Sequence, residues 1–147
     1  MVKVLIKKLD PTVKLPEYKT DGASGMDLLA FIKKPINVKP KKSSLIPTGL
    51  SVAFSEDYDI QIRPRSGLAV RNNISVLNTP GTIDSDYRGE IKIIIYNHGD
   101  ADFIINNGDR IAQMILSPVI KMELEVTNDL PETIRGKGGF GSTGRWI

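Results

Sequence analysis

The chain has 147 residues and a mass of 16.2 kDa, and its content of 40% hydrophobic and 25% charged residues is typical of one globular domain. It contains no cysteine, which excludes a disulfide scaffold, a Cys-ligated metal centre and a cysteine nucleophile. Its one histidine, His98, argues against a Ser-His-Asp triad or a multi-His metal site.

The net charge of +3 is unevenly distributed, because residues 1–42 carry ten lysines and four acids while all seven arginines lie after residue 62. We interpret the lysines as solvated surface charge, since a nucleic-acid-binding face more often interleaves arginines with aromatic residues. No run approaches the roughly 18 apolar residues of a membrane span, and the segment Met1–Lys8 is too short and charged for a secretory signal. We therefore expect a cytoplasmic protein with no targeting segment that binds neither nucleic acid nor membrane.

The chain is predicted to form short strands separated by turns rich in Pro, Gly, Asn and Asp. Strands are expected, in chain order, over residues 2–9, 44–54 with a break at 47–49, 59–63, 74–78, 90–97, 102–105, 110–116 and 119–126. Residues 90–97 are β-branched and apolar on both faces at their middle, which predicts a central, covered strand. Helical periodicity is confined to one or two possible turns at 66–72. The pattern predicts an all-β fold, as a sandwich, barrel or jelly roll.

The segment that begins at Arg135 differs in composition from the rest. Residues 135–145 include five glycines, two arginines, one lysine and one aromatic residue, Phe140. Such a segment cannot pack a core alone, and chain ends commonly fray. Its cationic side chains and unhindered backbone N–H groups are nevertheless the donors that wrap a polyphosphate. We expect an arm that becomes ordered over an anionic ligand.

Two central segments carry residues suited to a nucleotide. Pro64-Arg65-Ser66-Gly67 combines a permanently charged fork, a small hydroxyl and a residue that lets a ligand approach the backbone. Between two strands, Asn78 offers a donor and an acceptor to a planar imide edge. Asp84 and Tyr87, three residues apart across an expected hairpin, can face one pocket as a proton acceptor and a sugar-packing ring. Ordinary turn chemistry would explain each segment taken alone.

Two further polar residues interrupt apolar segments. Gln113 lies within an apolar run and needs a hydrogen-bond partner if it is buried. Asp27 is a single acid at the point where a loop enters a strand, a position more typical of a turn cap than of a metal ligand.

Taken together and in order, five segments resemble the motif set of the homotrimeric dUTP pyrophosphatases, or dUTPases. They are Ala23–Leu28, Pro64–Ala69, Asn78–Glu90, Gly108–Met114 and Arg135–Gly144, and they cover almost the whole chain. The resemblance implies a distorted jelly-roll or β-clip-like subunit over residues 1–134 with a flexible arm over 135–147. It further implies a homotrimer whose active sites are each shared, one subunit supplying the phosphate loops, a second the uracil hairpin and a third the arm.

The family reaction converts dUTP and water to dUMP and pyrophosphate, which removes dUTP from the DNA precursor pool and supplies dUMP for thymidylate synthesis. The resemblance implies that Asp84 activates the water that attacks the α-phosphorus, and that Tyr87 packs under deoxyribose and excludes a 2′-hydroxyl. The uracil edge would be bound by Asn78, Gly81, Thr82, Ile83 and Lys92. The phosphates would be bound by Arg65, Ser66, Gly67 and Gln113 and, from the arm, by Arg135, Gly141, Ser142 and Thr143, with Phe140 over the uracil. Mg²⁺ would be held chiefly by the triphosphate, with Asp27 at most an outer-shell contact.

Two alternatives stay open at this stage. A dCTP deaminase would share the fold and much of the phosphate apparatus, although the Asp84 and Tyr87 pairing and the glycine-rich arm with Phe140 favour the pyrophosphatase. A non-catalytic jelly-roll oligomer could bind nucleotide without turning it over. An unpaired carboxylate such as Asp84 beside a triphosphate argues against that second alternative.

Overall fold

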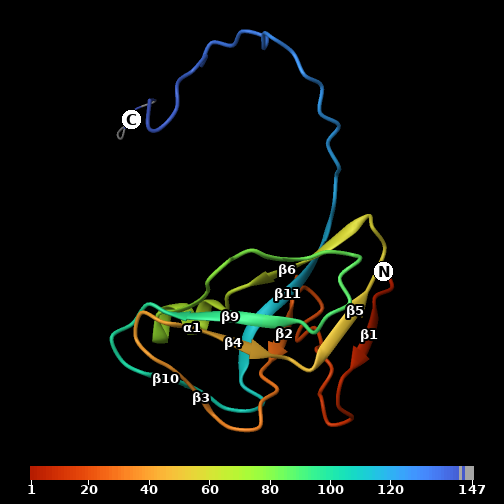
Figure 1. Ribbon diagram of the computed structural model, residues 1–147, viewed down its shortest axis with the longest axis vertical. Coiled ribbons are helices and arrows are strands. Elements are labelled where there is room, and N and C mark those ends of the chain that lie inside the picture. Colours follow the sequence, from red (N-terminus) through yellow and green to blue (C-terminus); the bar gives the residue numbers. More distant parts are fainter. Residues whose placement is uncertain (143, 145–147) are drawn as a thin grey trace.

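The computed structural model describes residues 1–142 and 144, and within them it is mostly β with one short helix (Figure 1). The elements, in chain order, are β1 (Leu5–Lys8), β2 (Met26–Leu29), β3 (Ile36–Val38), β4 (Ser43–Pro47), β5 (Leu50–Ala53), β6 (Tyr58–Arg63), α1 (Ser66–Asn72), β7 (Ile74–Val76), β8 (Gly81–Ile83), β9 (Lys92–Asn97), β10 (Phe103–Ile105) and β11 (Arg110–Pro118). The all-β prediction is confirmed at this level, and so is the short helix over 66–72.

The strands form two larger sheets and two short pairs, and every pairing is antiparallel. One sheet has the order β2-β11-β6-β8 and the other the order β4-β9-β7. Strands β1 and β5 form one of the short pairs, and β3 and β10 form the other. The expected strand over 44–54 is thus two strands in different sheets, and Gly49 lies at the break between them with a φ of 69°.

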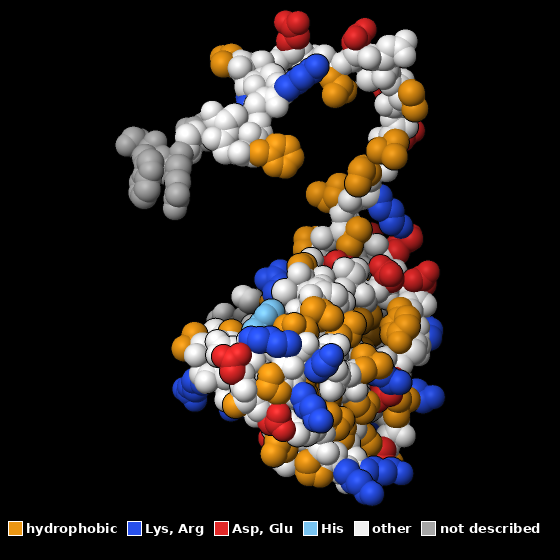
Figure 2. Space-filling model, turned by 60° about the vertical axis from the view of Figure 1, so that its left-hand side comes forward, with side chains coloured by type: hydrophobic (Ala, Val, Ile, Leu, Met, Phe, Trp, Pro, Cys, Tyr) orange, Lys and Arg blue, Asp and Glu red, His pale blue; other side chains and the backbone are white. Residues whose placement is uncertain are grey.

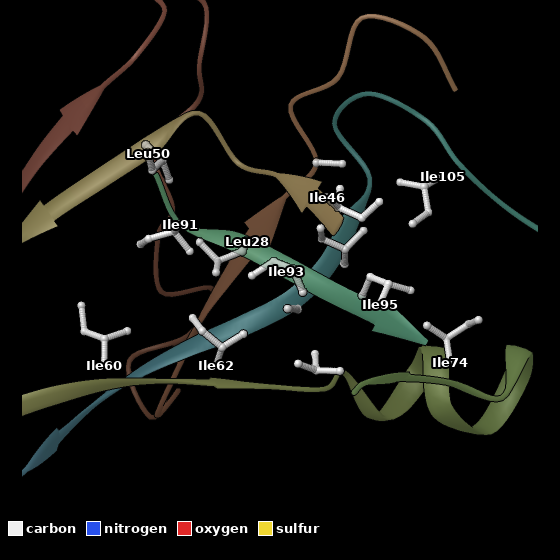
Figure 3. Close-up of a cluster of buried hydrophobic side chains, with 14 of the residues drawn as sticks. Leu28, Ile46, Leu50, Ile60, Ile62, Ile74, Ile91, Ile93, Ile95 and Ile105 are labelled. Carbon is white, nitrogen blue, oxygen red and sulfur yellow. The ribbon is translucent and has the colours of Figure 1, made fainter. Parts of the chain in front are cut away.

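The core lies between the two larger sheets. Figure 3 shows isoleucine and leucine side chains from both of them filling one continuous space. Strand β9 is central in its sheet as predicted, with Ile93 and Ile95 essentially inaccessible. Its opposite face is only partly covered, because Ile94 and Tyr96 stay half-exposed. The expectation of a strand covered on both faces is therefore correct for one face only.

The connection between β7 and β9 departs from a simple hairpin. These two strands do pair, with Ser75 opposite Tyr96, as the predicted hairpin requires. The connection between them crosses to the other sheet, where β8 pairs with β6. Sequence analysis did not predict β8 or β3, whereas β7 and β10, which also have three residues, were predicted within the expected ranges 74–78 and 102–105. The crossing matters for the site, since it carries the segment that begins at Asn78 along the edge of β6.

The C-terminal segment leaves the folded body after β11 (Figure 1). Its last contacts with the body are a hydrogen bond from the Val119 amide to the Asp57 carbonyl and an ion pair between Lys121 and Glu56. The prediction of a strand over 119–126 is wrong, because these residues pair with no strand of the described part. Their alternating apolar side chains are exposed, visible along the projecting segment in Figure 2. They are Ile120, Met122, Leu124 and Val126, which are 82–97% exposed.

No helix within residues 1–142 and 144 has the length and apolar character that crossing a bilayer requires.

Adjacent residues of β10 provide a test of the core. Ile105 is fully buried, whereas Ile104 is 57% exposed. We expect Ile105→Ala to lower the free energy of unfolding by about 2–5 kcal/mol, since it leaves a cavity. The matched Ile104→Ala change should stay within about 1 kcal/mol. Urea unfolding at fixed protein concentration measures both, and equal losses would contradict the placement of β10 over the core.

Candidate active site

At one end of the four-stranded sheet, a carboxylate and two guanidinium groups come together. Arg65 follows β6, and its side chain reaches across β11 so that its Nε donates to Asp27 Oδ1 on β2 at 2.9 Å. Arg110, the first residue of β11, donates from Nη1 to the other oxygen of Asp27 at 3.2 Å. Ser66 and Gly67 lie exposed beside this group at the start of α1. The structure thus places the predicted phosphate residues at one end of the sheet.

Gln113 lies at the same end of the sheet, on β11 between β2 and β6. In the register of the sheet it lies opposite Asp27 on one side and Arg63 on the other. Its Nε2 donates to the Pro64 carbonyl at 3.0 Å, which is the partner that a half-buried amide needs. Gly25 lies close to it, because a Cβ there would meet Gln113 Oε1 at 2.9 Å. The Gln113 side chain is therefore tied to the loop that carries Arg65.

The residues predicted to bind a uracil edge line one small cavity. This cavity, of about 40 Å³, is formed by β6, β7, β8 and β9. Asn78, Gly81, Thr82, Ile83 and Lys92 all contribute to its lining. A Cβ on Gly81 would lie 3.2 Å from Asn78 Nδ2, so the glycine leaves room for the amide. These five residues therefore lie around one space, and their binding of a uracil edge stays a prediction.

Asp84 and Tyr87 lie in the turn after β8. The Tyr87 amide donates to the Asp84 carbonyl at 3.1 Å, which closes a turn across the three-residue spacing. The Tyr87 hydroxyl donates to the Glu90 carbonyl at 3.0 Å, and a Cβ on Gly89 would lie 2.3 Å from that hydroxyl. The phenol end of the ring therefore lies directly against a glycine. Both residues line an open cavity of about 280 Å³ together with Thr82, Ile83 and Lys92.

Asp84 also borders a second cavity, whose charged lining residues are mainly acidic. That cavity, of about 410 Å³, is lined by Glu56, Asp59 and Asp86 as well as Lys121. Asp84 is itself exposed, so its carboxylate can reach solvent or a ligand. Its position suits a proton acceptor for water rather than a member of a closed ion pair.

Within one chain Arg65 and Asp84 lie at opposite ends of the β6–β8 pair. Ile83 lies opposite Ile60, so the following residue, Asp84, continues past Asp59. Arg65 lies six residues further along the chain, beyond the other end of β6. At about 3.3 Å per residue this separation is roughly 20 Å. The Arg65 side chain, moreover, folds toward Asp27 rather than along β6.

The arm residues lie apart from both groups. Arg135, Phe140, Gly141 and Ser142 belong to the projecting segment, in which Phe140 is fully exposed. Thr143 lies outside the described residues. The described residues of the arm therefore supply none of the contacts to the two groups within this chain.

The described residues offer no group of three or more acidic or histidine side chains that could hold a metal ion. Asp27 already accepts a guanidinium bond on each oxygen. This part of the chain therefore does not fit a protein-held Mg²⁺, whereas a bound triphosphate would bring its own oxygen ligands.

Sequence reasoning missed three residues that line or build the candidate site. Arg110 lies in one of the five motif segments, but its local context indicates no role. Leu45 of β4 and Ile94 of β9 line the open cavity beside Asp84. A signal existed only for Arg110, a cation in the same motif segment as Gln113. Leu45 and Ile94 are ordinary strand residues whose place depends on how the sheets pack.

Comparison with known proteins identifies the family. Residues 12–144 match the family model described as dUTPase. A deoxyuridine 5′-triphosphate nucleotidohydrolase of Rickettsia bellii (strain OSU 85-389) is 52% identical over 148 residues, covering 100% of this chain and 99% of the relative. The enzyme of the same description from Chlamydia pneumoniae is 54% identical over 138 residues, covering 93% of this chain and 95% of the relative.

Solved structures agree at the level of the fold. A mutant dUTPase of Staphylococcus bacteriophage 80alpha, solved with dUpNHpp, superposes with a TM-score of 0.86 at 23% identity, covering 97% of this chain and 98% of the other. A mutant dUTPase of phage phi11 of S. aureus has a TM-score of 0.79 at 20% identity, covering 88% of this chain and 99% of the other. The family model matches residues 12–144, and the two relatives are 52% and 54% identical over nearly their whole length. The chain therefore belongs to the dUTPase family.

Proposed function

We propose that the chain hydrolyses dUTP to dUMP and pyrophosphate through a water molecule that Asp84 activates for attack on the α-phosphorus. The observation that carries the proposal is the single cavity lined by Asn78, Gly81, Thr82, Ile83 and Lys92, which adjoins Asp84. Relatives that are 52–54% identical over nearly their full length are named for this activity. Hydrolysis by this chain would remove dUTP from the DNA precursor pool and supply dUMP for thymidylate synthesis.

Selection for uracil follows from the polar groups of the cavity. Asn78 presents one acceptor and one donor, which match the N3–H and a carbonyl of uracil. Cytosine reverses the donor pattern at its exocyclic position and would leave cavity groups unpaired. The methyl group of thymine would be excluded by the close approach of the hairpin backbone to the base.

Selection for deoxyribose is assigned to Tyr87. Its hydroxyl is fixed by the Glu90 carbonyl, and its ring packs against the turn at Gly89. A ring held in this way provides a flat surface for the sugar. It would also occupy the space that a 2′-hydroxyl needs, so UTP would be excluded.

The triphosphate is assigned to Arg65, Ser66, Gly67 and Gln113. Attack on an anionic phosphorus needs positioning and charge neutralisation more than covalent help. Arg65 supplies a permanent charge, and Ser66 would bind near the oxygen that links the α- and β-phosphates as it becomes the leaving group. Gln113 would contact the α-phosphate and the attacking water. This division requires Arg65 and Asp84 to meet around one triphosphate.

A site shared between copies satisfies that requirement. The roughly 20 Å between Asp84 and Arg65 along β6 exceeds what one α-phosphate can bridge. We therefore assign the uracil hairpin with Asp84 to one subunit and the phosphate loop with Arg65 to its neighbour, in a homotrimer of jelly-roll-like subunits. The exposed apolar residues of the projecting segment, such as Ile120 and Val126, support assembly, because a neighbouring subunit could cover them.

The arm over 135–147 is assigned to the site of a further neighbour. Its glycines and cations suit a triphosphate, and Phe140, exposed in the single chain, would cover the uracil face. Arg135, Gly141, Ser142 and Thr143 would meet the β- and γ-phosphates. Ordering such a glycine-rich segment is entropically unfavourable, so we expect it to close only over bound ligand.

Members of the family use Mg²⁺, and the phage phi11 relative is described as coordinating a structural Mg(II) ion. In this chain the metal would be held by the phosphates and water rather than by a protein cage. It would neutralise phosphate charge.

Pyrophosphate release from dUTP, UTP, dTTP and dCTP tests the function directly. We expect turnover of dUTP alone, since each of the other nucleotides leaves a polar group unpaired or meets a steric conflict. Ammonia release from dCTP would instead indicate a deaminase. Absence of turnover by folded protein that still binds nucleotide would indicate a non-catalytic relative.

The role of Asp84 is tested by Asp84→Asn, with Asp100→Asn, an exposed acid outside the candidate site, as the matched control. Removal of a general base should lower kcat by at least about a hundredfold. Binding of dUpNHpp should stay nearly unchanged, because the amide keeps the size of the carboxylate. Asp100→Asn should behave like the unmodified chain. Full activity of Asp84→Asn would rule out Asp84 as the base.

Subunit mixing tests whether the site is shared. Chains with Asp84→Asn and chains with Arg65→Gln should each be nearly inactive. After unfolding and refolding together in equal amounts, about one site in four would receive both intact residues from different chains and regain activity. If each site were built within one chain, every site would keep a defect and the mixture would stay inactive.

A further inference from the structure

The Asp27 carboxylate has an unusual environment for a group beside a phosphate site. Its side chain is only 17% exposed, and it bonds to Arg65 and Arg110 with one oxygen each, at 2.9 and 3.2 Å. The three groups come from segments far apart in the sequence, since Arg65 is 38 and Arg110 is 83 residues from Asp27. Tertiary pairing of β2 with β11 and of β11 with β6 is what assembles them.

These contacts fix the Arg65 guanidinium along two of its edges. Its Nε donates to Asp27, and its Nη1 donates to the backbone carbonyl of Arg110 at 3.1 Å. Among the contacts that the described residues make, Nη2 is left for a ligand. A planar guanidinium held in this way presents a fixed donor direction, which lowers the entropy lost when it binds a phosphate.

Arg110 completes the arrangement from the other side. Its bond to Asp27 Oδ2 prevents the carboxylate from rotating about its terminal torsion, and its backbone carbonyl is the second anchor of Arg65. The three side chains together carry one net positive charge. A dication placed directly on Asp27 would have to displace one guanidinium and would be repelled by the other.

We propose that Asp27 and Arg110 are positioning residues that orient Arg65 toward the triphosphate, and that Asp27 does not act by holding Mg²⁺. This inference rests on the proposed function, because it assumes that Arg65 binds phosphate. Asp27 contributes by keeping the Arg65 guanidinium in one orientation. Arg110 contributes through its carbonyl and by balancing the charge of Asp27.

Asp27→Asn is the first test, because it keeps the shape and removes one acceptor and the charge. The new amide N–H₂ would face the N–H of Arg110, so one bond of the arrangement must break. We expect affinity for dUpNHpp to fall by roughly tenfold, on the scale of one charge-assisted hydrogen bond. Affinity for deoxyuridine, which has no phosphate, should stay unchanged in an NMR titration.

Asp100→Asn is the matched control. Asp100 also pairs with a cation, Lys41 at 3.1 Å, but its side chain is 96% exposed and it is not one of the residues of the candidate site. The same chemical change there should leave both affinities unchanged. Loss of both ligands in Asp27→Asn would mean that Asp27 supports the fold in general, and unchanged binding of both would mean that it does not orient Arg65. Either result overturns the proposal.

A double-mutant cycle separates positioning from other roles. In an Arg65→Gln background, Asp27→Asn should cause no further loss of dUpNHpp affinity, because the group that it positions is already absent. Additive losses would overturn the proposal. The Mg²⁺ concentration that half-saturates dUpNHpp binding should be the same with and without Asp27→Asn, and a raised requirement would assign Asp27 to the metal instead.

Arg110→Gln keeps the proposal testable if Asp27→Asn does not fold. It should weaken dUpNHpp binding by a few-fold and leave deoxyuridine binding unchanged, whereas an unchanged affinity for dUpNHpp would count against the proposal. None of these binding measurements requires turnover. Hydrolysis of dUTP by the unmodified chain tests the proposed function separately, so failure of one can be told from failure of the other.

Discussion

Strand β11 hydrogen-bonds to β2 along one edge and to β6 along the other, and the candidate site depends on this two-sided pairing. The pairing places Gln113 opposite both Asp27 and Arg63, and it brings Arg110 to the carboxylate of Asp27. The same strand continues to Pro118, from which the chain leaves the body. A change of register by one residue would turn Gln113 to the core face and remove it from the Pro64 carbonyl.

The pairing of β8 with β6 sets the direction of the segment from Asn78 to Asp84. Asn78 lies toward the end of β6 that carries Arg63, and Asp84 lies toward the end that carries Asp59. Because β8 runs antiparallel to β6, the chain from Asn78 to Asp84 leads away from its own Arg65. In the shared site that we propose, this geometry is the reason that Asp84 and Arg65 of one chain would serve different sites.

The two ends of the β6–β8 pair also differ in charge. Around Asp27 the two guanidinium groups give a net positive region, suited to a polyanion. Around Asp84 the neighbours Glu56, Asp59 and Asp86 give an acidic hollow, which suits a base that must attract a proton. A triphosphate would favour the first region and be repelled by the second. Under the proposed function, charge would help to orient the substrate, with its phosphates directed toward Arg65 of one copy and its α-phosphorus nearest Asp84 of another.

The sequence by itself determined the all-β class, the short helix at 66–72 and most strand positions, because alternation and turn residues are local signals. It also determined the family, since five ordered motifs carry that information without any structure. Only the tertiary structure decided which residues meet. The bonds of Asp27 with Arg65 and Arg110 span 38 and 83 residues, and no local pattern encodes such pairing. Residues 119–126 show that a local pattern alone does not form a strand. They alternate like a strand but pair with no strand of the described part, because a strand needs a partner edge that the sequence pattern cannot supply.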